Sequence, residues 1–168
     1  MRQAPLKTLL IVFHTMTGGS QQMAEAAQRG ALAEEGIETR LVRAGDATAE
    51  DVLRADGYVF VTPENLASMS GVMKDFFDRT YYAALERIEG RPYATLVCAG
   101  SDGTNAVRQI ERICTGWRLK PVCEPLIVCT HAQTPETILA PKTIGFKDLR
   151  RCEETGAAIA AGLALGIF

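Results

Sequence analysis

Strand-like and helix-like patterns alternate along the whole chain. Short, continuous apolar runs predict buried strands at residues 6–13, 37–42, 58–62, 93–99 and 126–130. Helical patterns predict helices at residues 22–35, 49–55, 70–85, 103–114 and 146–163. Strands that alternate with helices in this way require a parallel sheet with helices on both faces. We therefore predict a three-layer α/β sandwich in one domain over residues 1–168.

Length and charge restrict the classes of partner. A chain of 168 residues suits one domain with a substantial core. Its formal net charge of −2 offers no electrostatic attraction to nucleic acid or to an anionic membrane. The apolar runs are too short to span a bilayer, and residues 6–13 lead directly into a glycine-containing loop, which favours a strand over a signal peptide. We expect a cytoplasmic protein.

The cysteines carry no obvious chemistry. Their number is odd, no CxxC pair occurs, and most have apolar neighbours. This pattern predicts reduced, mainly buried thiols, with a redox-active cysteine as the alternative. No cluster has the spacing of a metal site, so no metal is predicted. The cysteines are Cys98, Cys114, Cys123, Cys129 and Cys152.

A loop rich in glycine and hydroxyl groups joins the first predicted strand to the first predicted helix. The N–H groups and the macrodipole of a helix start attract an anion, and Gly18 and Gly19 let the backbone approach it. Thr15, Thr17 and Ser20 add hydroxyl donors. The loop itself contains no Lys or Arg, which favours an enclosed monophosphate over a triphosphate with magnesium.

Two more polar or glycine-containing loops follow the third and fourth predicted strands. They are Thr62–Met69 and Ala99–Gly103. In an open parallel sheet, ligands bind at the carboxyl ends of the strands, near the switch in strand order. A strand order of 2-1-3-4-5 would place strands one, three and four side by side. The three loops would then form one contiguous site.

Two of these segments resemble a known superfamily. The sequence Thr15-Met16-Thr17-Gly18-Gly19-Ser20 is similar to the flavodoxin-like phosphate loop, T/S-x-T-G-x-T/S. The run from Thr62 to Arg79 resembles the second signature of the NAD(P)H-dependent FMN reductases and related quinone oxidoreductases. The resemblance follows the order of elements over essentially the whole chain. It implies a flavodoxin-like fold and FMN as the cofactor.

The resemblance also assigns residues to each part of the flavin. The FMN phosphate would be held by Thr15, Thr17, Gly18, Gly19, Ser20 and Gln21, with Met16 facing the ribityl chain or the ring edge. One side of the isoalloxazine would be bordered by Pro63, Glu64, Asn65, Ala67, Ser68 and Met69. Its other side would be closed by Ala99, Gly100, Ser101, Asp102 and Gly103. Candidates for polar contacts near the reacting ring are Asn65, Ser68 and Asp102.

The ring-binding loops distinguish two functions. Electron-transfer flavodoxins commonly stack a Trp or Tyr on the flavin and are strongly acidic, whereas residues 63–70 and 99–105 contain no aromatic residue. An exposed ring face favours an NAD(P)H-dependent oxidoreductase that reduces a quinone or free flavin by ping-pong hydride transfer. The alternatives are a flavodoxin-type carrier that serves a redox protein, and a binding module without flavin. The resemblance further implies a homodimer or homotetramer.

Two further side chains are interpreted as structural. His14 ends the first strand beside the predicted site, where a solvated or capping role is favoured over proton donation. Trp117 lies at a helix end, away from the three loops in sequence, which favours packing or an interface over flavin stacking. The segment 131–145 has two prolines and no periodicity, and loops of this length are more often functional or mobile than incidental.

Overall fold

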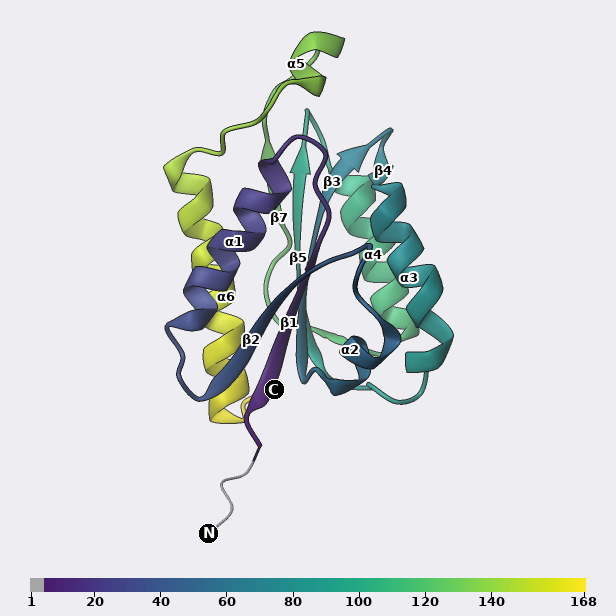
Figure 1. Cartoon of the computed structure of the whole chain (residues 1–168), viewed down its shortest axis with the longest axis vertical. Helices are drawn as coiled ribbons and strands as arrows, with labels where there is room; N and C mark the ends of the chain where they lie inside the picture. The colour runs from purple at the N-terminus through teal and green to yellow at the C-terminus, as the bar shows by residue number, and fades with distance from the viewer. Residues whose placement is uncertain (1–4) are drawn as a thin grey trace.

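A mainly parallel sheet runs through the middle of the molecule, between two layers of helices (Figure 1). The structure is a computed structural model that describes residues 5–168, so the first four residues of the predicted domain lie outside the described residues. Side chains of α1 and α6 share one core cluster with one face of the sheet. Side chains of α2, α3 and α4 share a second cluster with the other face.

The elements follow the predicted alternation. The strands are β1 (Lys7–Phe13), β2 (Ile37–Arg43), β3 (Gly57–Asn65), β4 (Ser68–Met69), β5 (Pro92–Ala99), β6 (Lys120–Pro121) and β7 (Leu126–Cys129). The helices are α1 (Gly19–Leu32), α2 (Ala49–Arg54), α3 (Gly71–Ala84), α4 (Thr104–Gly116), α5 (Pro135–Leu139) and α6 (Phe146–Leu165). The predicted elements are therefore present, with β4, β6 and α5 as additions.

The strand order confirms the predicted topology. β1 pairs in parallel with β2 and β3, β3 pairs with β5, and β5 pairs with β7. Since β5 and β7 are the fourth and fifth predicted strands, this is the order 2-1-3-4-5. The two-residue strand β6 pairs with the start of β5. The carboxyl ends of β1, β3 and β5 consequently lie side by side at one edge of the sheet.

Strand β3 extends beyond its predicted end. The prediction stopped it at Thr62, because the next residue is a proline. The register of β1 with β3 ends at Val61, so the missing N–H of Pro63 removes no bond to β1. Asn65 then pairs with Ser68 in an antiparallel hairpin to β4. The two residues between them have positive φ, as a type I′ turn requires.

The first helix begins earlier than predicted and packs tightly on the last one. α1 starts at Gly19 rather than at residue 22, because the left-handed Gly18 (φ 94°) turns the chain directly into the helix. A Cβ built on Gly156 would lie 1.9 Å from the carbonyl oxygen of Ala27. A Cβ on Gly30 would lie equally close to the carbonyl oxygen of Glu153. The backbones of α1 and α6 therefore touch, which only glycine at both positions allows.

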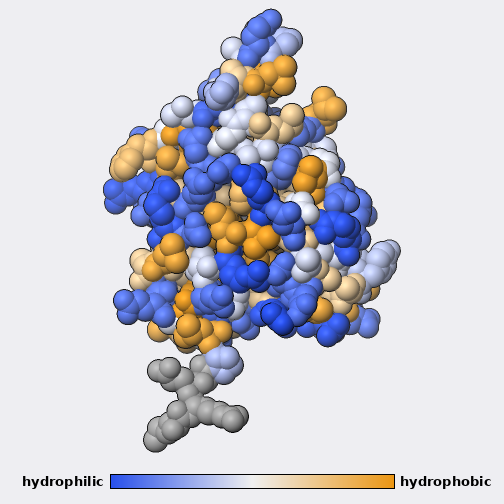
Figure 2. All heavy atoms as spheres, viewed as in Figure 1, coloured by the Kyte–Doolittle hydropathy of each residue, from blue (hydrophilic) through white to orange (hydrophobic). Residues whose placement is uncertain are grey.

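Residues 131–145, hereafter the arm, connect β7 to α6 and project beyond the carboxyl edge of the sheet (Figure 1). The arm is not wholly irregular, since it contains α5. The side chain of Thr134 caps α5 by accepting a hydrogen bond from the N–H of Thr137, and Pro135 occupies its first turn. No residue of α5 is buried. Figure 2 shows hydrophobic atoms on this projection beside hydrophilic ones.

The aromatic side chains lie mainly in the core between the sheet and α3 and α4. Trp117 is fully buried, stacks on Tyr81 and donates a hydrogen bond from Nε1 to the Tyr81 carbonyl oxygen at 2.9 Å. This contact agrees with its interpretation as a packing residue. Within residues 5–168, no helix combines the length and apolar character needed to cross a membrane.

The α1–α6 contact leads to a stability prediction. We expect Gly156→Ala to lower the free energy of unfolding by about 1–3 kcal/mol, because the new methyl group forces two backbones apart. Gly71→Ala is the matched control, since a Cβ there meets no atom within 4 Å. Urea unfolding followed by circular dichroism measures both variants. Equal stability of the two variants would contradict the tight contact.

Candidate functional site

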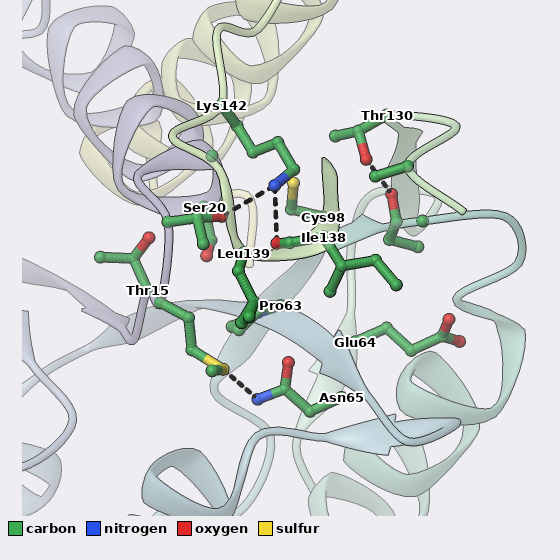
Figure 3. A pocket seen from close by; sticks show the side chains of 16 residues that line it. Thr15, Ser20, Pro63, Glu64, Asn65, Cys98, Thr130, Ile138, Leu139 and Lys142 are labelled. Carbon is green, nitrogen blue, oxygen red and sulfur yellow. Dashed lines mark hydrogen bonds between the residues drawn. The ribbon is translucent and has the colours of Figure 1, made fainter. Parts of the chain in front are cut away.

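The three predicted loops meet in one pocket at the carboxyl edge of the sheet (Figure 3). Together with its open mouth, the hollow is about 550 Å³. It lies between the start of α1, the ends of β3 and β5, and the arm. The residues that line it are Thr15, Met16, Thr17, Gly19, Ser20, Pro63, Glu64, Asn65, Cys98, Ala99, Gly100, Thr130, Ala132, Ile138, Leu139 and Lys142.

The loop between β1 and α1 is held by its own hydroxyl groups. The N–H of Gly18 donates to Thr15 Oγ1 at 2.9 Å, and Ser20 Oγ donates to the carbonyl oxygen of His14 at 2.7 Å. Gly19 brings the helix start against β5, because a Cβ there would lie only 2.6 Å from Cys98 Sγ. The loop is thus tightly turned. Gly18 is required for its left-handed conformation, and Gly19 for the close approach to Cys98.

The donors of this loop fit a phosphate group. Gly18, the residue before α1, provides no side-chain hydrogen bond to the helix start. Within residues 5–168, no protein acceptor meets the N–H groups of Gly19, Ser20 and Gln21. Free first-turn amides and the helix dipole form an anion site. Thr15 accepts a bond and still has its own proton to donate, whereas the proton of Ser20 is used within the loop.

The second loop contributes its first residues to the pocket. Pro63, Glu64 and Asn65, which end β3, all line it. Glu64 Oε2 accepts a hydrogen bond from the N–H of Gly103 at 2.6 Å, so this carboxylate ties the second loop to the third. Asn65 Nδ2 lies 3.0 Å from Met16 Sδ, which links the second loop to the first.

The remaining predicted residues of the second loop lie outside the pocket lining. Ala67 is in the hairpin turn, and its carbonyl oxygen accepts a bond from Asn105 Nδ2. Ser68 Oγ and the N–H of Met69 both donate to Gln109 Oε1, at 2.9 and 3.0 Å. These two residues therefore fasten the hairpin to α4.

The third loop, like the second, contributes only its first residues to the pocket lining. Ala99 and Gly100 line the pocket, whereas Ser101, Asp102 and Gly103 do not. The exposed carboxylate of Asp102 accepts hydrogen bonds from Oγ1 and N–H of Thr104, which lower the pKa of Asp102. Gly103 precedes α4 in a left-handed conformation, with φ of 87°. Its N–H is the group bound by Glu64.

Several lining residues were not among the predicted site residues. Thr130 is the last residue of the fifth predicted strand and directly follows β7, and the rule that placed the other loops could have included it. Cys98 lies within β5, and burial raises the pKa of its thiol to about 11, so it stays protonated at neutral pH. The residues contributed by the arm are Ala132, Ile138, Leu139 and Lys142. The arm has no periodicity from which their position could have been predicted.

Lys142 adds a positive charge beside the predicted phosphate loop, which is itself uncharged. The loop itself contains no Lys or Arg, as the sequence indicates. The fold nevertheless brings Lys142 Nζ to 3.4 Å from Thr17 Oγ1, and the N–H of Lys142 donates to the Thr17 carbonyl oxygen at 2.8 Å. A positive charge therefore lies beside the loop. Separation by 125 residues hid it from a local analysis of the sequence.

His14 joins the first loop to the start of α3. Its Nδ1 lies 2.8 Å from Ser70 Oγ, which also accepts hydrogen bonds from the N–H of Met73 and from Thr62 Oγ1. The serine hydroxyl can donate to a neutral imidazole, but a protonated Nδ1 would be a third donor to the same oxygen. Burial and then the charge of Arg43 lower the pKa of His14. The half-buried histidine thus lies beside the pocket, in contact with Ser70, the residue that caps α3.

The fold and the pocket define a flavodoxin-like α/β protein, and comparison with known proteins specifies the family. The chain belongs to the NADPH-dependent FMN reductase family, whose model matches residues 44–133. That range contains the second and third loops and β7, and it begins after the phosphate loop. Membership in this family confirms the predicted resemblance and supports FMN as the cofactor.

Curated relatives match over part of their length. The chain is 39% identical over 93 residues to the flavodoxin of Aquifex aeolicus (strain VF5), covering 55% of this chain and 48% of the relative. It is 30% identical over 95 residues to an NAD(P)H dehydrogenase (quinone) of Acidithiobacillus ferrooxidans, covering 45% and 48%. The chain thus spans about half the length of these relatives.

Solved structures match the fold over nearly the whole chain. A flavodoxin from the domain Archaea superposes with a TM-score of 0.76 at 17% identity, covering 93% of this chain and 98% of the other. A WrbA-like flavodoxin from Agrobacterium tumefaciens gives a TM-score of 0.72 at 16% identity, covering 95% and 98%. At these identities the similarity shows the fold alone.

The environment of His14 leads to a prediction on pH. The ordinary pKa of histidine is 6.5, and the folded protein lowers it. Below pH 6.5 the unfolded chain takes up a proton that folded His14 resists, so stability falls as the pH decreases from this value. His14→Asn keeps a hydrogen-bond acceptor but does not titrate. Urea unfolding from pH 7 to about 5 should show a weaker pH dependence in this variant. An identical dependence would argue against this role of His14.

Proposed function

We propose that the chain is an FMN-dependent oxidoreductase that takes hydride from NAD(P)H and passes it to a quinone or a free flavin. One observation carries the proposal: the starts of three loops converge on a pocket where the first-turn amides of α1 have no protein acceptor within residues 5–168. Membership in the NADPH-dependent FMN reductase family supports the same activity.

The residues present suit the different parts of FMN. The amides of Gly19, Ser20 and Gln21 would hold the phosphate, together with the hydroxyl protons of Thr15 and Thr17. The isoalloxazine would lie between the end of β3 and the start of the third loop. The residues that face it there would be Pro63, Glu64, Asn65, Ala99 and Gly100.

The side chains around the ring site favour a reductase. When bound, FMN supplies the redox chemistry, since it can take up hydride from a reduced nicotinamide and return it to an acceptor. No aromatic side chain is among the lining residues within 5–168, so no stacked ring would block a nicotinamide. Ile138 and Leu139 reach into the pocket from the arm and could exclude water from the reacting face (Figure 3).

A flavodoxin-type electron carrier is the second candidate. Its support is specific, since the relative with 39% identity is named a flavodoxin. Both functions use the same phosphate loop and ring site. They differ in whether a nicotinamide can reach the bound flavin, and in whether the acceptor is a small molecule or a redox protein.

Flavin reduction separates the two candidates. We expect the purified protein to bind FMN with the absorbance bands of a flavoprotein, and anaerobic NADH or NADPH to bleach these bands within seconds. A flavoprotein that dithionite bleaches but neither nucleotide reduces would support the carrier. A protein that takes up no FMN would contradict both candidates. Turnover with a quinone and with free flavin then identifies the class of acceptor.

Two substitutions test the ring contacts. We expect Asn65→Ala to weaken FMN binding by about threefold to tenfold, because a neutral hydrogen bond contributes roughly 0.5–1.5 kcal/mol. Asp102→Ala should retain the affinity, since the Asp102 carboxylate is exposed and bonded to Thr104. Fluorescence titration of FMN measures both dissociation constants. Full retention in Asn65→Ala would remove this residue from the ring contacts.

A further inference from the structure

Lys142 lies where the arm returns to the phosphate loop. Its backbone N–H donates to the Thr17 carbonyl oxygen at 2.8 Å, and its own carbonyl oxygen accepts a bond from Gln22 Nε2 at 2.7 Å. Gln22 Oε1 accepts a further bond from the N–H of Ile144 at 3.0 Å. The backbone around Lys142 is therefore fixed on α1, whatever position its side chain adopts.

The ammonium group of Lys142 has acceptors on two sides. On the arm, Nζ donates to the carbonyl oxygens of Ile138 at 2.8 Å and Ala140 at 2.6 Å. On the loop, it lies 3.4 Å from Thr17 Oγ1. An ammonium group has three donors, so these contacts occupy all of them. The contact of Nζ with Thr17 Oγ1 is the longest of the three. A ligand acceptor on the loop side can therefore form a shorter bond with Nζ than Thr17 does.

A phosphate on this loop would compete for the same ammonium group. A phosphate oxygen accepts a shorter and stronger hydrogen bond from Lys than a neutral carbonyl does. Lys142 is the one cationic side chain among the pocket-lining residues of the described chain. The other charged lining residue, Glu64, has its carboxylate bonded to the N–H of Gly103.

We propose that Lys142 provides the counter-charge for the phosphate of FMN and thereby makes the pocket select FMN over riboflavin. This inference rests on the proposed flavin-binding function, which it deepens. The helix start and the threonine hydroxyls recognise the shape of a phosphate, and Lys142 adds recognition of its charge. Because the lysine belongs to the arm, the arm is part of the cofactor site rather than a connection between β7 and α6.

The test compares flavin affinities in the full chain after any co-purified flavin has been removed. FMN and riboflavin are titrated into the wild type, Lys142→Met, Lys142→Arg and Lys147→Met, at low and high salt. Lys147 is an exposed lysine five positions further along, so its substitution changes the net charge equally. Circular dichroism verifies the fold of each variant, and Lys142→Arg retains the positive charge if the Met variant folds poorly.

The expected result is a selective loss. Lys142→Met should weaken FMN binding by about tenfold to a hundredfold, the effect typical of a hydrogen bond to a charged group, and leave riboflavin binding unchanged. Lys142→Arg should retain most of the FMN affinity, and Lys147→Met all of it. The salt dependence of FMN binding should also decrease in Lys142→Met.

Other results would overturn the inference. Equal FMN affinity in Lys142→Met and the wild type would exclude the counter-charge, and equal losses for FMN and riboflavin would indicate that Lys142 acts only by holding the arm. If the wild type binds neither flavin, the proposed function fails, and inorganic phosphate then tests the lysine separately. Phosphate-induced NMR shifts of the Gly19 amide that disappear in Lys142→Met would support Lys142 as the counter-charge of a bound phosphate, without the selection of FMN. No shift, or equal shifts in all variants, would overturn it.

Discussion

The parallel pairing of β1, β3 and β5 is the constraint on which the rest of the structure depends. It places the carboxyl ends of three strands at one edge of the sheet, so that loops from residues 15, 63 and 99 onward meet in one pocket. It also requires helical crossovers, and the first of these points the free amides of α1 at that pocket. The pocket, and with it the proposed phosphate and ring sites, is a consequence of strand order.

Much of this arrangement could be predicted because it depends on patterns local to the sequence. Apolar runs and helical periodicity predicted the strands and helices, and the loops followed from the strand ends. The order 2-1-3-4-5 was assumed together with the flavodoxin-like resemblance, and the observed pairing confirms it. The hairpin from Asn65 to Ser68 could not be predicted, because its turn contains Leu66 and Ala67 rather than the glycine or asparagine that usually mark positive φ. That unpredicted turn is the reason why Ser68 and Met69 contact Gln109 and not the pocket.

The arm shows a second limit of sequence-based prediction. Its contacts with the pocket depend on single hydrogen bonds between residues more than 100 positions apart, such as those of Gln22 with Lys142 and Ile144. No periodic pattern accompanies bonds of this kind. Motifs within the loops predicted the neutral donors of the proposed phosphate site, whereas the charged Lys142 beside them was found only in the three-dimensional structure. The same holds for the apolar side chains that α5 contributes.

The close contacts of Gly30 with Glu153 and of Gly156 with Ala27 have a consequence for how the pocket tolerates mutation. α1 begins at the phosphate loop and is pressed along its length against α6, with no side chain between the two backbones at the point of contact. Because no side chains separate the two backbones, no side-chain rearrangement can make room for an added atom. A methyl group there would push α1 and α6 apart, and the first residues of α1 line the pocket. The packing of α6 against α1 therefore also bears on where the first turn of α1 lies at the pocket.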